Sequence, residues 1–125
     1  MTDEFKSRKI DVLGKVSLNF ERSKIAYENY IREGKIYLHA RILKESNQRI
    51  RDLLLENAHI LKNNLRDDAV DLITHYDIWF EMWNDLKQKI APELYDVFIF
   101  ENKFKFPKEA EKRLKEEFSK IKKLN

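Results

Sequence analysis

The apolar side chains of residues 65–90 recur with the period of an α-helix, and they include an aromatic-rich stretch, LITHYDIWFEMWNDL, at 72–86. At 100° per residue they fall within an arc of about 140°, which leaves the acidic residues of the stretch outside it. The arc comprises Ala69, Leu72, Ile73, Tyr76, Trp79, Phe80, Trp83, Leu86 and Ile90. The pattern predicts a helix from Leu65 to about Ile90 whose aromatic side chains belong mainly to a core.

Two apolar residues of this helix, Ile78 and Met82, project from its polar side. They are four positions apart, so they are neighbours on a helix surface, and His75 lies beside them. A single exposed apolar side chain means little, but an adjacent pair is suited to touch another protein. We therefore predict a partner contact at Ile78, Met82 and His75.

A second apolar pattern, spaced by three and four residues in turn, begins after Gly34. Its members are Ile36, Ala40, Leu43, Asn47, Ile50 and Leu54. A repeat of this kind makes a seam against another helix, which belongs either to the same chain or to a second copy. Within the seam Asn47 is either a partly exposed edge residue or a buried amide that fixes register. The apolar face shifts upstream of Gly34, so we expect a bend, a break or a close helix contact there.

The remaining boundaries follow from glycine, proline and capping residues. Gly14 is expected to end a short helix over Asp3–Leu13, with Ser17 or Asn19 capping the next one. Asn64 is the expected cap of the aromatic helix. Pro92 forbids simple continuation, although helix could resume and persist to Phe98. Pro107 suits the first turn of a final helix with an apolar stripe formed by Ala110, Leu114, Phe118, Ile121 and Leu124.

The segment 97–106, VFIFENKFKF, alternates apolar and polar residues better in its second half than in its first. It is compatible with a short β-hairpin or an extended loop, with its phenylalanines packed on helices. The fold class predicted for the whole chain, residues 1–125, is a single all-α domain. It is a small bundle of three to four helices, with two long antiparallel helices and a C-terminal helix.

Composition supports this fold class and narrows the possible chemistry. The 125 residues are 42% hydrophobic and 38% charged, with two glycines and two prolines, which favours helices over turn-rich β folds. The absence of cysteine excludes disulfides, thiolate metal sites and cysteine nucleophiles. No apolar run is long enough for a membrane span, so we expect a cytoplasmic protein with no membrane association. No metal site and no cofactor is predicted, because no ligand or phosphate-loop motif is present.

Charge is unevenly distributed along the chain. Residues 67–102 hold 2 basic and 9 acidic side chains, whereas residues 103–125 hold 9 basic and 4 acidic ones. These blocks either neutralise one another or present a basic face to nucleic acid. The candidate nucleic-acid contacts are Lys103, Lys105, Lys120, Lys122 and Lys123, of which the first two alternate with phenylalanines able to stack on bases.

One short motif offers candidate catalytic residues. The stretch REGKIYLH places six residues between Arg32 and His39. It is similar to the Arg-x(4–6)-His signature of the HEPN ribonucleases, although Glu33 stands where that family usually has Asn, Asp or His. The resemblance implies a small all-α dimer in which Arg32 and His39 of two protomers cleave RNA.

The chain offers no other set of convergent catalytic residues. The preferred function is therefore non-enzymatic: a helical protein–protein interaction or regulatory module that self-associates or binds another protein. In a homodimer the seam of Ile36, Leu43, Asn47, Ile50 and Leu54 would form the interface. The alternatives are a nucleic-acid-binding accessory protein that uses the basic N- and C-terminal blocks, and a small HEPN-like ribonuclease or toxin-type effector.

Overall fold

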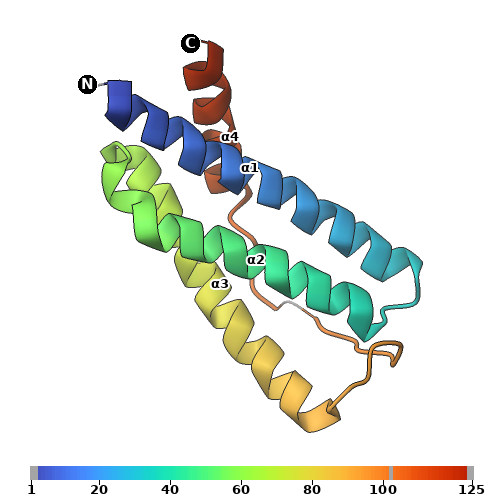
Figure 1. Ribbon diagram of the computed structural model, residues 1–125. Coiled ribbons are helices and arrows are strands. Elements are labelled where there is room, and N and C mark those ends of the chain that lie inside the picture. Colours follow the sequence, from blue (N-terminus) through green and yellow to red (C-terminus); the bar gives the residue numbers. More distant parts are fainter. Residues whose placement is uncertain (1–2, 102, 124–125) are drawn as a thin grey trace.

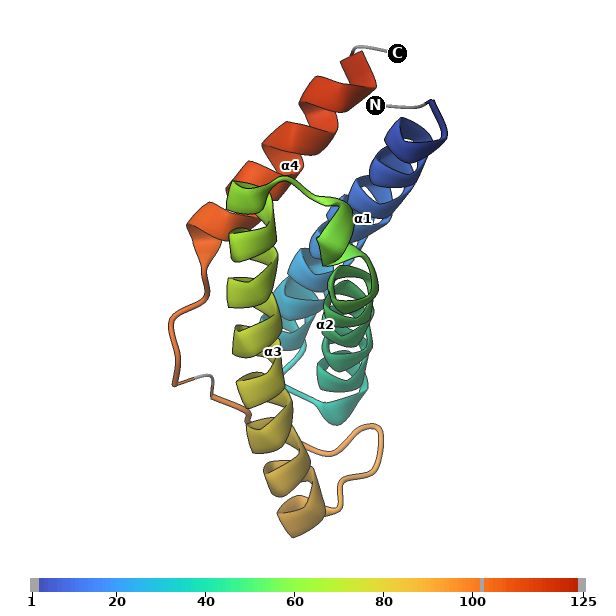
Figure 2. The same cartoon turned by 90° about the vertical axis from the view of Figure 1, so that its left-hand side faces the viewer.

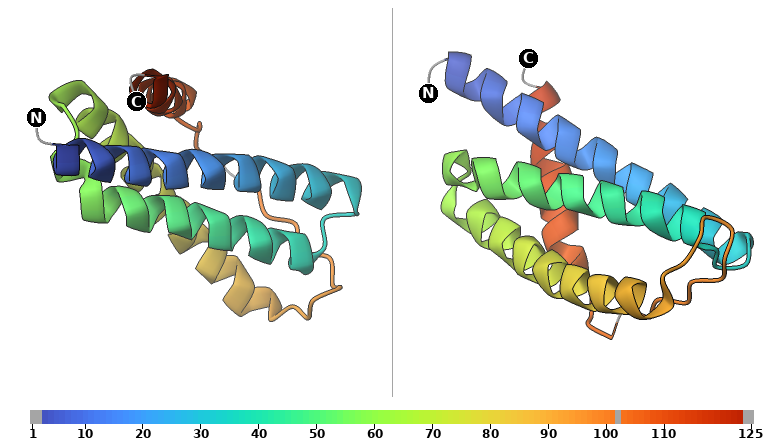
Figure 3. Two further views of the ribbon diagram at one scale, coloured as in Figure 1. Left: turned by 45° about the horizontal axis from the view of Figure 1, so that its top comes forward. Right: turned by 60° about the horizontal axis from the view of Figure 1, so that its bottom comes forward.

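The computed structural model describes residues 3–101 and 103–123, and over these residues it is an all-α bundle (Figure 1). Its helices are α1 (Asp3–Arg32), α2 (Tyr37–Asn57), α3 (Asn63–Ile90) and α4 (Lys108–Lys123), with a short 3-10 helix at Ala58–Ile60. Helix α2 runs antiparallel to both α1 and α3, and α4 packs across α1 and α3 (Figure 3). The start of α1 and the end of α4 lie at the same end of the bundle (Figure 2). The predicted fold class is confirmed.

Gly14 does not end a helix, and the short first helix predicted from it is wrong. Helix α1 continues through Gly14 to Arg32. The glycine lies where α4 crosses α1: a Cβ atom at this position would sit 3.1 Å from the ring of Phe118. Its missing side chain therefore allows two helices to approach, although a glycine inside a helix costs about 1 kcal/mol relative to alanine. Ser17 and Asn19, the expected caps, are interior residues of α1.

The break expected near Gly34 is present. Helix α1 ends at Arg32, and the chain turns through Gly34 and Lys35, whose φ angles are 84° and 57°. No side chain caps the helix that follows. Instead, the N–H groups of Tyr37 and Leu38 donate to the carbonyls of Asp96 and Leu94, at 2.8 Å in each case. The first turn of α2 is thus completed by the loop that follows α3.

Both ends of α3 differ in detail from the prediction. The helix begins at Asn63, so its N-cap is Lys62 rather than Asn64, and no side chain caps it. It ends at Ile90, because Ala91 adopts a left-handed conformation (φ 47°) and Pro92 follows. Continuation of helix to Phe98 is therefore wrong, and Ile90 is exposed rather than part of the core.

The segment 97–106 is an extended loop, apart from residue 102, which lies outside the described residues. A single isolated bridge between Ile36 and Val97 is its only β-type pairing among the described residues, so the hairpin alternative is wrong. From this loop Phe98 enters the core completely. The loop and α4 together cover the side of the bundle on which α1 and α3 face each other (Figure 2).

The core consists of two clusters. The first joins all four helices and includes the fully buried Leu13, Ile50, Leu54, Leu72 and Leu114. The second lies at the opposite end and is mostly aromatic; it contains Tyr30, Tyr37, Ala40, Trp79, Trp83 and Phe98. The aromatic stripe predicted for α3 is thus confirmed as core, and so is the stripe of α4 as far as Ile121, whereas Leu124 lies outside the described residues.

An ion pair fastens α4 to α3. The guanidinium of Arg113 donates two hydrogen bonds, of 2.8 and 2.9 Å, to the carboxylate of the buried Asp68. These bonds raise the pKa of Arg113 above its usual value. Because the arrangement is bidentate, it fixes the orientation of α4 as well as its position.

None of the described helices is both long and apolar enough to cross a membrane.

Candidate functional site

The loop after α3 is held to the bundle by a buried tyrosine. The hydroxyl of Tyr30 donates to the carbonyl of Phe98 at 2.5 Å and accepts from the N–H of Phe100 at 2.9 Å. The N–H of Phe98 donates to the carbonyl of Lys35 at 2.8 Å. Burial raises the pKa of Tyr30, although the hydrogen bond from Phe100 opposes this shift. These contacts turn Phe98 and Phe100 towards the helices.

The opposite side of the same segment faces solvent. Val97 and Ile99, which alternate with the two phenylalanines, are 58% and 52% exposed, and Tyr95 is 76% exposed. The backbone N–H and C=O groups of Val97 and Ile99 have no hydrogen-bond partner within residues 3–101 and 103–123. We call residues 94–99 the loop edge. Residues 94–96 of this edge form a turn, and residues 97–99 are extended, with the outward backbone groups of Val97 and Ile99 unpaired.

Beside the loop edge lies a cavity of about 780 Å³ between α1 and α3. Its floor is formed by α2, and residues of the loop and of the first turn of α4 complete its walls. Aromatic side chains dominate the lining: Tyr27, Tyr30, Tyr76, Trp79, Trp83 and Phe100. We call it the aromatic cavity. Both the loop and the first turn of α4 contribute to its walls.

The floor of the aromatic cavity holds a small polar cluster. The hydroxyl of Ser23 donates to Oδ1 of Asn47 at 2.8 Å and lies 2.7 Å from the hydroxyl of Ser46. The hydroxyl of Ser46 in turn donates to the carbonyl of Leu43 at 2.9 Å. The NH2 group of Asn47 donates to no residue that the structure describes, although Asn47 is only 7% exposed. This NH2 group is therefore left over at the floor of the cavity, where it keeps some solvent contact.

The rim of the aromatic cavity is charged. Lys24, Lys35 and Lys108 line it, and no described carboxylate lies within ion-pair distance of their ammonium groups. Two acids also line it, Glu101 and Glu111, of which Glu111 pairs with Lys115 at 3.0 Å. The rim therefore carries an excess of positive charge.

Trp83 lies in the wall of the aromatic cavity with a second unpaired donor. It is 2% exposed, and its indole N–H has no acceptor among the described residues. The ammonium groups of Lys44 and Lys87 lie 5.6 and 5.4 Å from its ring centroid, within the range of a cation–π interaction.

Of the residues predicted to contact a partner, Ile78 and Met82 lie one turn apart on α3 and are not buried, whereas His75 is buried. His75 is buried, lines the aromatic cavity and packs its ring edge-on against Phe106 at 5.3 Å. Burial lowers its pKa below the usual 6.5. Ile78 is 38% exposed and borders a separate hollow between α2 and α3, and Met82 is half-buried.

The predicted seam lies within the chain. Ile50 and Leu54 are fully buried in the first core cluster, and Asn47 belongs to the floor of the aromatic cavity. Leu43 packs against the second cluster, and Ile36 makes the bridge to Val97. The helices that α2 packs against are the chain's own α1 and α3.

Arg32 and His39, the candidate catalytic pair, make different contacts in the structure. Arg32 is exposed at the end of α1, where its guanidinium bonds to Asn29 and Glu33. His39 lies in the first turns of α2 and borders a hollow with Leu18 and Ile25 on the outer side of α1. The two side chains, both within the described part of the chain, form no hydrogen bond with each other.

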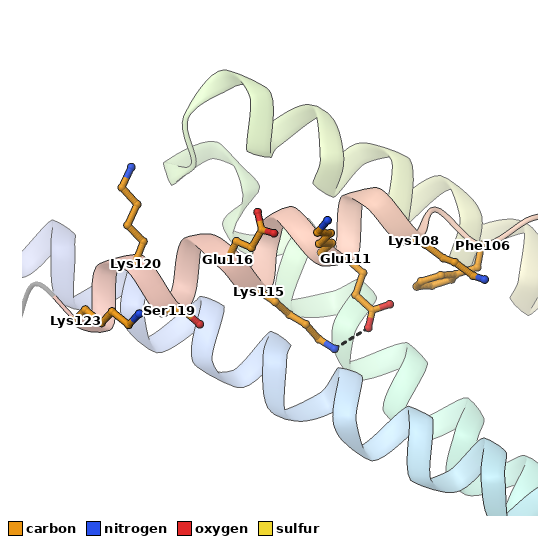
Figure 4. A pocket seen from close by; sticks show the side chains of 9 residues that line it. Phe106, Lys108, Glu111, Lys115, Glu116, Ser119, Lys120 and Lys123 are labelled. Carbon is orange, nitrogen blue, oxygen red and sulfur yellow. Dashed lines mark ion pairs between the residues drawn. The ribbon is translucent and has the colours of Figure 1, made fainter.

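The candidate nucleic-acid lysines divide into separate groups. Lys120 and Lys123 border a shallow hollow of about 910 Å³ along α4, together with Lys108 and Lys112 (Figure 4). Lys122 lies over the ring of Phe118 at 5.6 Å. Lys103 and Lys105 are exposed in the loop. Glu111 and Glu116 lie within the same hollow, so the lysine face is interrupted by acids.

Sequence reasoning missed the contribution of α1 to the aromatic cavity. Val16, Phe20, Ser23, Tyr27 and Tyr30 are spaced by four and three residues in turn, which is the same signal that was recognised in α2. A serine at a seam position would have indicated a polar cluster facing another helix.

Comparison with protein-family models, curated proteins and solved structures finds no match to this chain. Within the described residues, no group of three or more His, Asp and Glu side chains is arranged to hold a metal ion.

Proposed function

We propose that this protein is a non-enzymatic interaction module that binds an extended segment of another protein along the loop edge. The observation that carries this proposal is the unpaired backbone of Val97 and Ile99, flanked by their exposed apolar side chains. Proteins with such an edge add a partner strand, in which main-chain hydrogen bonds supply affinity and alternate side chains supply specificity. The bridge to Ile36 and the bonds to Tyr30 hold the loop edge in its extended form beforehand.

Charge indicates the chemistry of the partner. The loop edge is bordered by Glu93, Asp96 and Glu101, all exposed. A second copy paired on this edge would bring the two sets of acids together, which opposes association. A partner segment with alternating apolar residues and flanking lysines or arginines satisfies both the apolar and the acidic features. We therefore favour another protein over a second copy of this chain as the occupant.

A direct test uses a fluorescent peptide of alternating valine and lysine, with binding followed by fluorescence anisotropy. The double substitution Val97→Lys and Ile99→Lys should abolish binding, because it removes the apolar side chains and repels the peptide. The matched control is Leu55→Lys with Val70→Lys, two residues that are similarly exposed but lie on α2 and α3. The control should bind like the parent.

The backbone contribution is tested separately by Ile99→Pro. This change removes an unpaired N–H group and spares the N–H groups of Phe98 and Phe100, which hold the loop. Binding should weaken at least several-fold, while the melting temperature stays close to that of the parent. If the loop-edge variants bind as the parent does, the proposed edge is wrong. Light scattering that gives twice the 15.2 kDa chain mass, and 15.2 kDa for the Val97→Lys, Ile99→Lys variant, would identify a second copy as the occupant.

A further inference from the structure

The geometry points to a small-molecule site in the aromatic cavity, independent of any partner on the loop edge. The volume of about 780 Å³ is within the range of cavities that bury a small organic ligand. We infer that its ligand is a flat aromatic or heteroaromatic acid. Three features of the lining support this chemical class: its aromatic walls, its leftover amide donor and its lysine rim.

The walls favour a flat ring over an acyl chain. Trp79 and Trp83 stack at 6.5 Å between centroids with an interplanar angle of 19°, and Phe100 meets Trp79 edge-on at 5.0 Å. Tyr27, 54% exposed, stands across the cavity on α1. Aromatic rings gain about 0.5–1.5 kcal/mol from offset or edge contacts beyond burial alone, which an aliphatic chain does not gain.

The floor supplies one specific polar contact. Asn47 is fixed by its bond from Ser23, and its NH2 group has no described acceptor. A ring nitrogen, hydroxyl or carbonyl oxygen of a ligand would accept a hydrogen bond from this NH2 group. This contact explains why a heteroaromatic ring fits the floor better than a plain hydrocarbon.

The rim determines the charge of the ligand. Lys24, Lys35 and Lys108 come from α1, from the turn after it and from α4, and their ammonium groups have no described carboxylate partner. Two acids also line the rim, Glu101 and Glu111, and Glu111 shares Lys115 with Glu21, so the three lysines still outnumber the acids. A carboxylate or sulfonate at the mouth is therefore favoured over a neutral or cationic group.

The test compares two fluorescent probes that differ only in charge, anilinonaphthalene sulfonate and its neutral parent anilinonaphthalene. Both tryptophans of this chain line the cavity, so energy transfer and tryptophan quenching follow the bound probe, and the variants below locate it. We expect saturable binding of one sulfonate probe per chain, with tryptophan quenching and a raised melting temperature, since ligands that prefer the native state stabilise it. The neutral probe should bind roughly tenfold more weakly, if each lysine contributes as exposed ion pairs do.

Matched variants separate this cavity from the lysine hollow on α4. Changing Lys24 and Lys35 to Gln should reduce the preference for the sulfonate several-fold. Changing Lys120 and Lys123 to Gln, with the same loss of charge, should leave it intact. Ser23→Leu fills the floor and should weaken both probes. The inference is overturned if the two probes bind equally to the parent, if the α4 variant loses the preference instead, or if binding lacks energy transfer and lowers the melting temperature.

Discussion

The hydroxyl of Tyr30 is a single group on which the position of the whole loop depends, and Tyr30→Phe removes it with little change in shape. The loss breaks the bond to the carbonyl of Phe98 and the bond from the N–H of Phe100. Neither backbone group has another described partner. Phe98 is fully buried and Phe100 is half-buried, so water replaces the lost bonds poorly.

The size of the effect follows from these two bonds. A typical buried hydrogen bond contributes about 1 kcal/mol net, and a buried group left without a partner costs about 1–3 kcal/mol. We therefore expect Tyr30→Phe to lower the free energy of unfolding by about 2–4 kcal/mol. For a domain whose total stability is of order 5–15 kcal/mol, this is a large fraction. Urea denaturation followed by tryptophan fluorescence measures it, because Trp79 and Trp83 pack beside the loop.

Tyr27→Phe is the matched control. Tyr27 lies one turn earlier on α1, 6.5 Å from the ring of Tyr30, but is 54% exposed, so its change should stay within about 0.5 kcal/mol. Amide hydrogen exchange adds a local measurement: in Tyr30→Phe the N–H groups of Phe98 and Phe100 should exchange faster, while the core of α3 is affected less. Equal stabilities for the two variants, with unchanged exchange at Phe100, would refute the view that Tyr30 holds the loop.

Three further predictions concern charge and packing. Because burial lowers the folded-state pKa of His75, the unfolded chain binds more protons at this residue as the pH falls. Stability should therefore fall as the pH drops from about 7 towards 5, and His75→Gln should flatten this slope in urea titrations. Gly14→Leu should lower the free energy of unfolding by about 1–3 kcal/mol, because the larger side chain overlaps with Phe118. Gly14→Ala should be nearly neutral, because the better helix propensity of alanine offsets the 3.1 Å contact. Thermal melts that give the two variants the same melting temperature would contradict this. If the basic residues bind nucleic acid, an electrophoretic mobility shift seen at low salt should weaken steeply as salt is added. The shift should disappear when five lysines become Gln: Lys103, Lys105, Lys120, Lys122 and Lys123. The absence of any shift at low salt would contradict nucleic-acid binding.

The spacing of apolar residues in the sequence was enough to predict the long helices and the apolar stripes that they bury. The aromatic arc of α3 depends only on residue spacing, and Tyr76, Trp79 and Trp83 are buried where that spacing places them. Gly14 misled for a physical reason: a glycine that ends a helix and one that admits a crossing helix look alike until the crossing helix is placed. The end of α3 was similarly uncertain, because Ala91 rather than a glycine adopts the left-handed conformation there.

The sites could not be found in the same way, because they depend on contacts between distant segments. The loop edge is extended because Lys35, Tyr30 and Tyr37 bond to it, and none of these residues is near it in sequence. The aromatic cavity needs the relative positions of three helices and a loop. The apolar seam of α2 was recognised, but residue spacing alone does not say which helix packs against it. In the structure α2 packs against α1 and α3.

The completion of α2 by the loop also affects the order in which a newly made chain can fold. Tyr37 and Leu38 receive their carbonyl partners from Leu94 and Asp96, which a ribosome adds almost sixty residues later. At roughly 5–20 residues per second, several seconds pass before those carbonyls exist. During this time α1 and α2 can associate, but the first turn of α2 should fray. The turn of the nascent helical hairpin is therefore accessible to chaperones and proteases. Once the loop is synthesised and its carbonyls bond to the first turn of α2, this turn is protected.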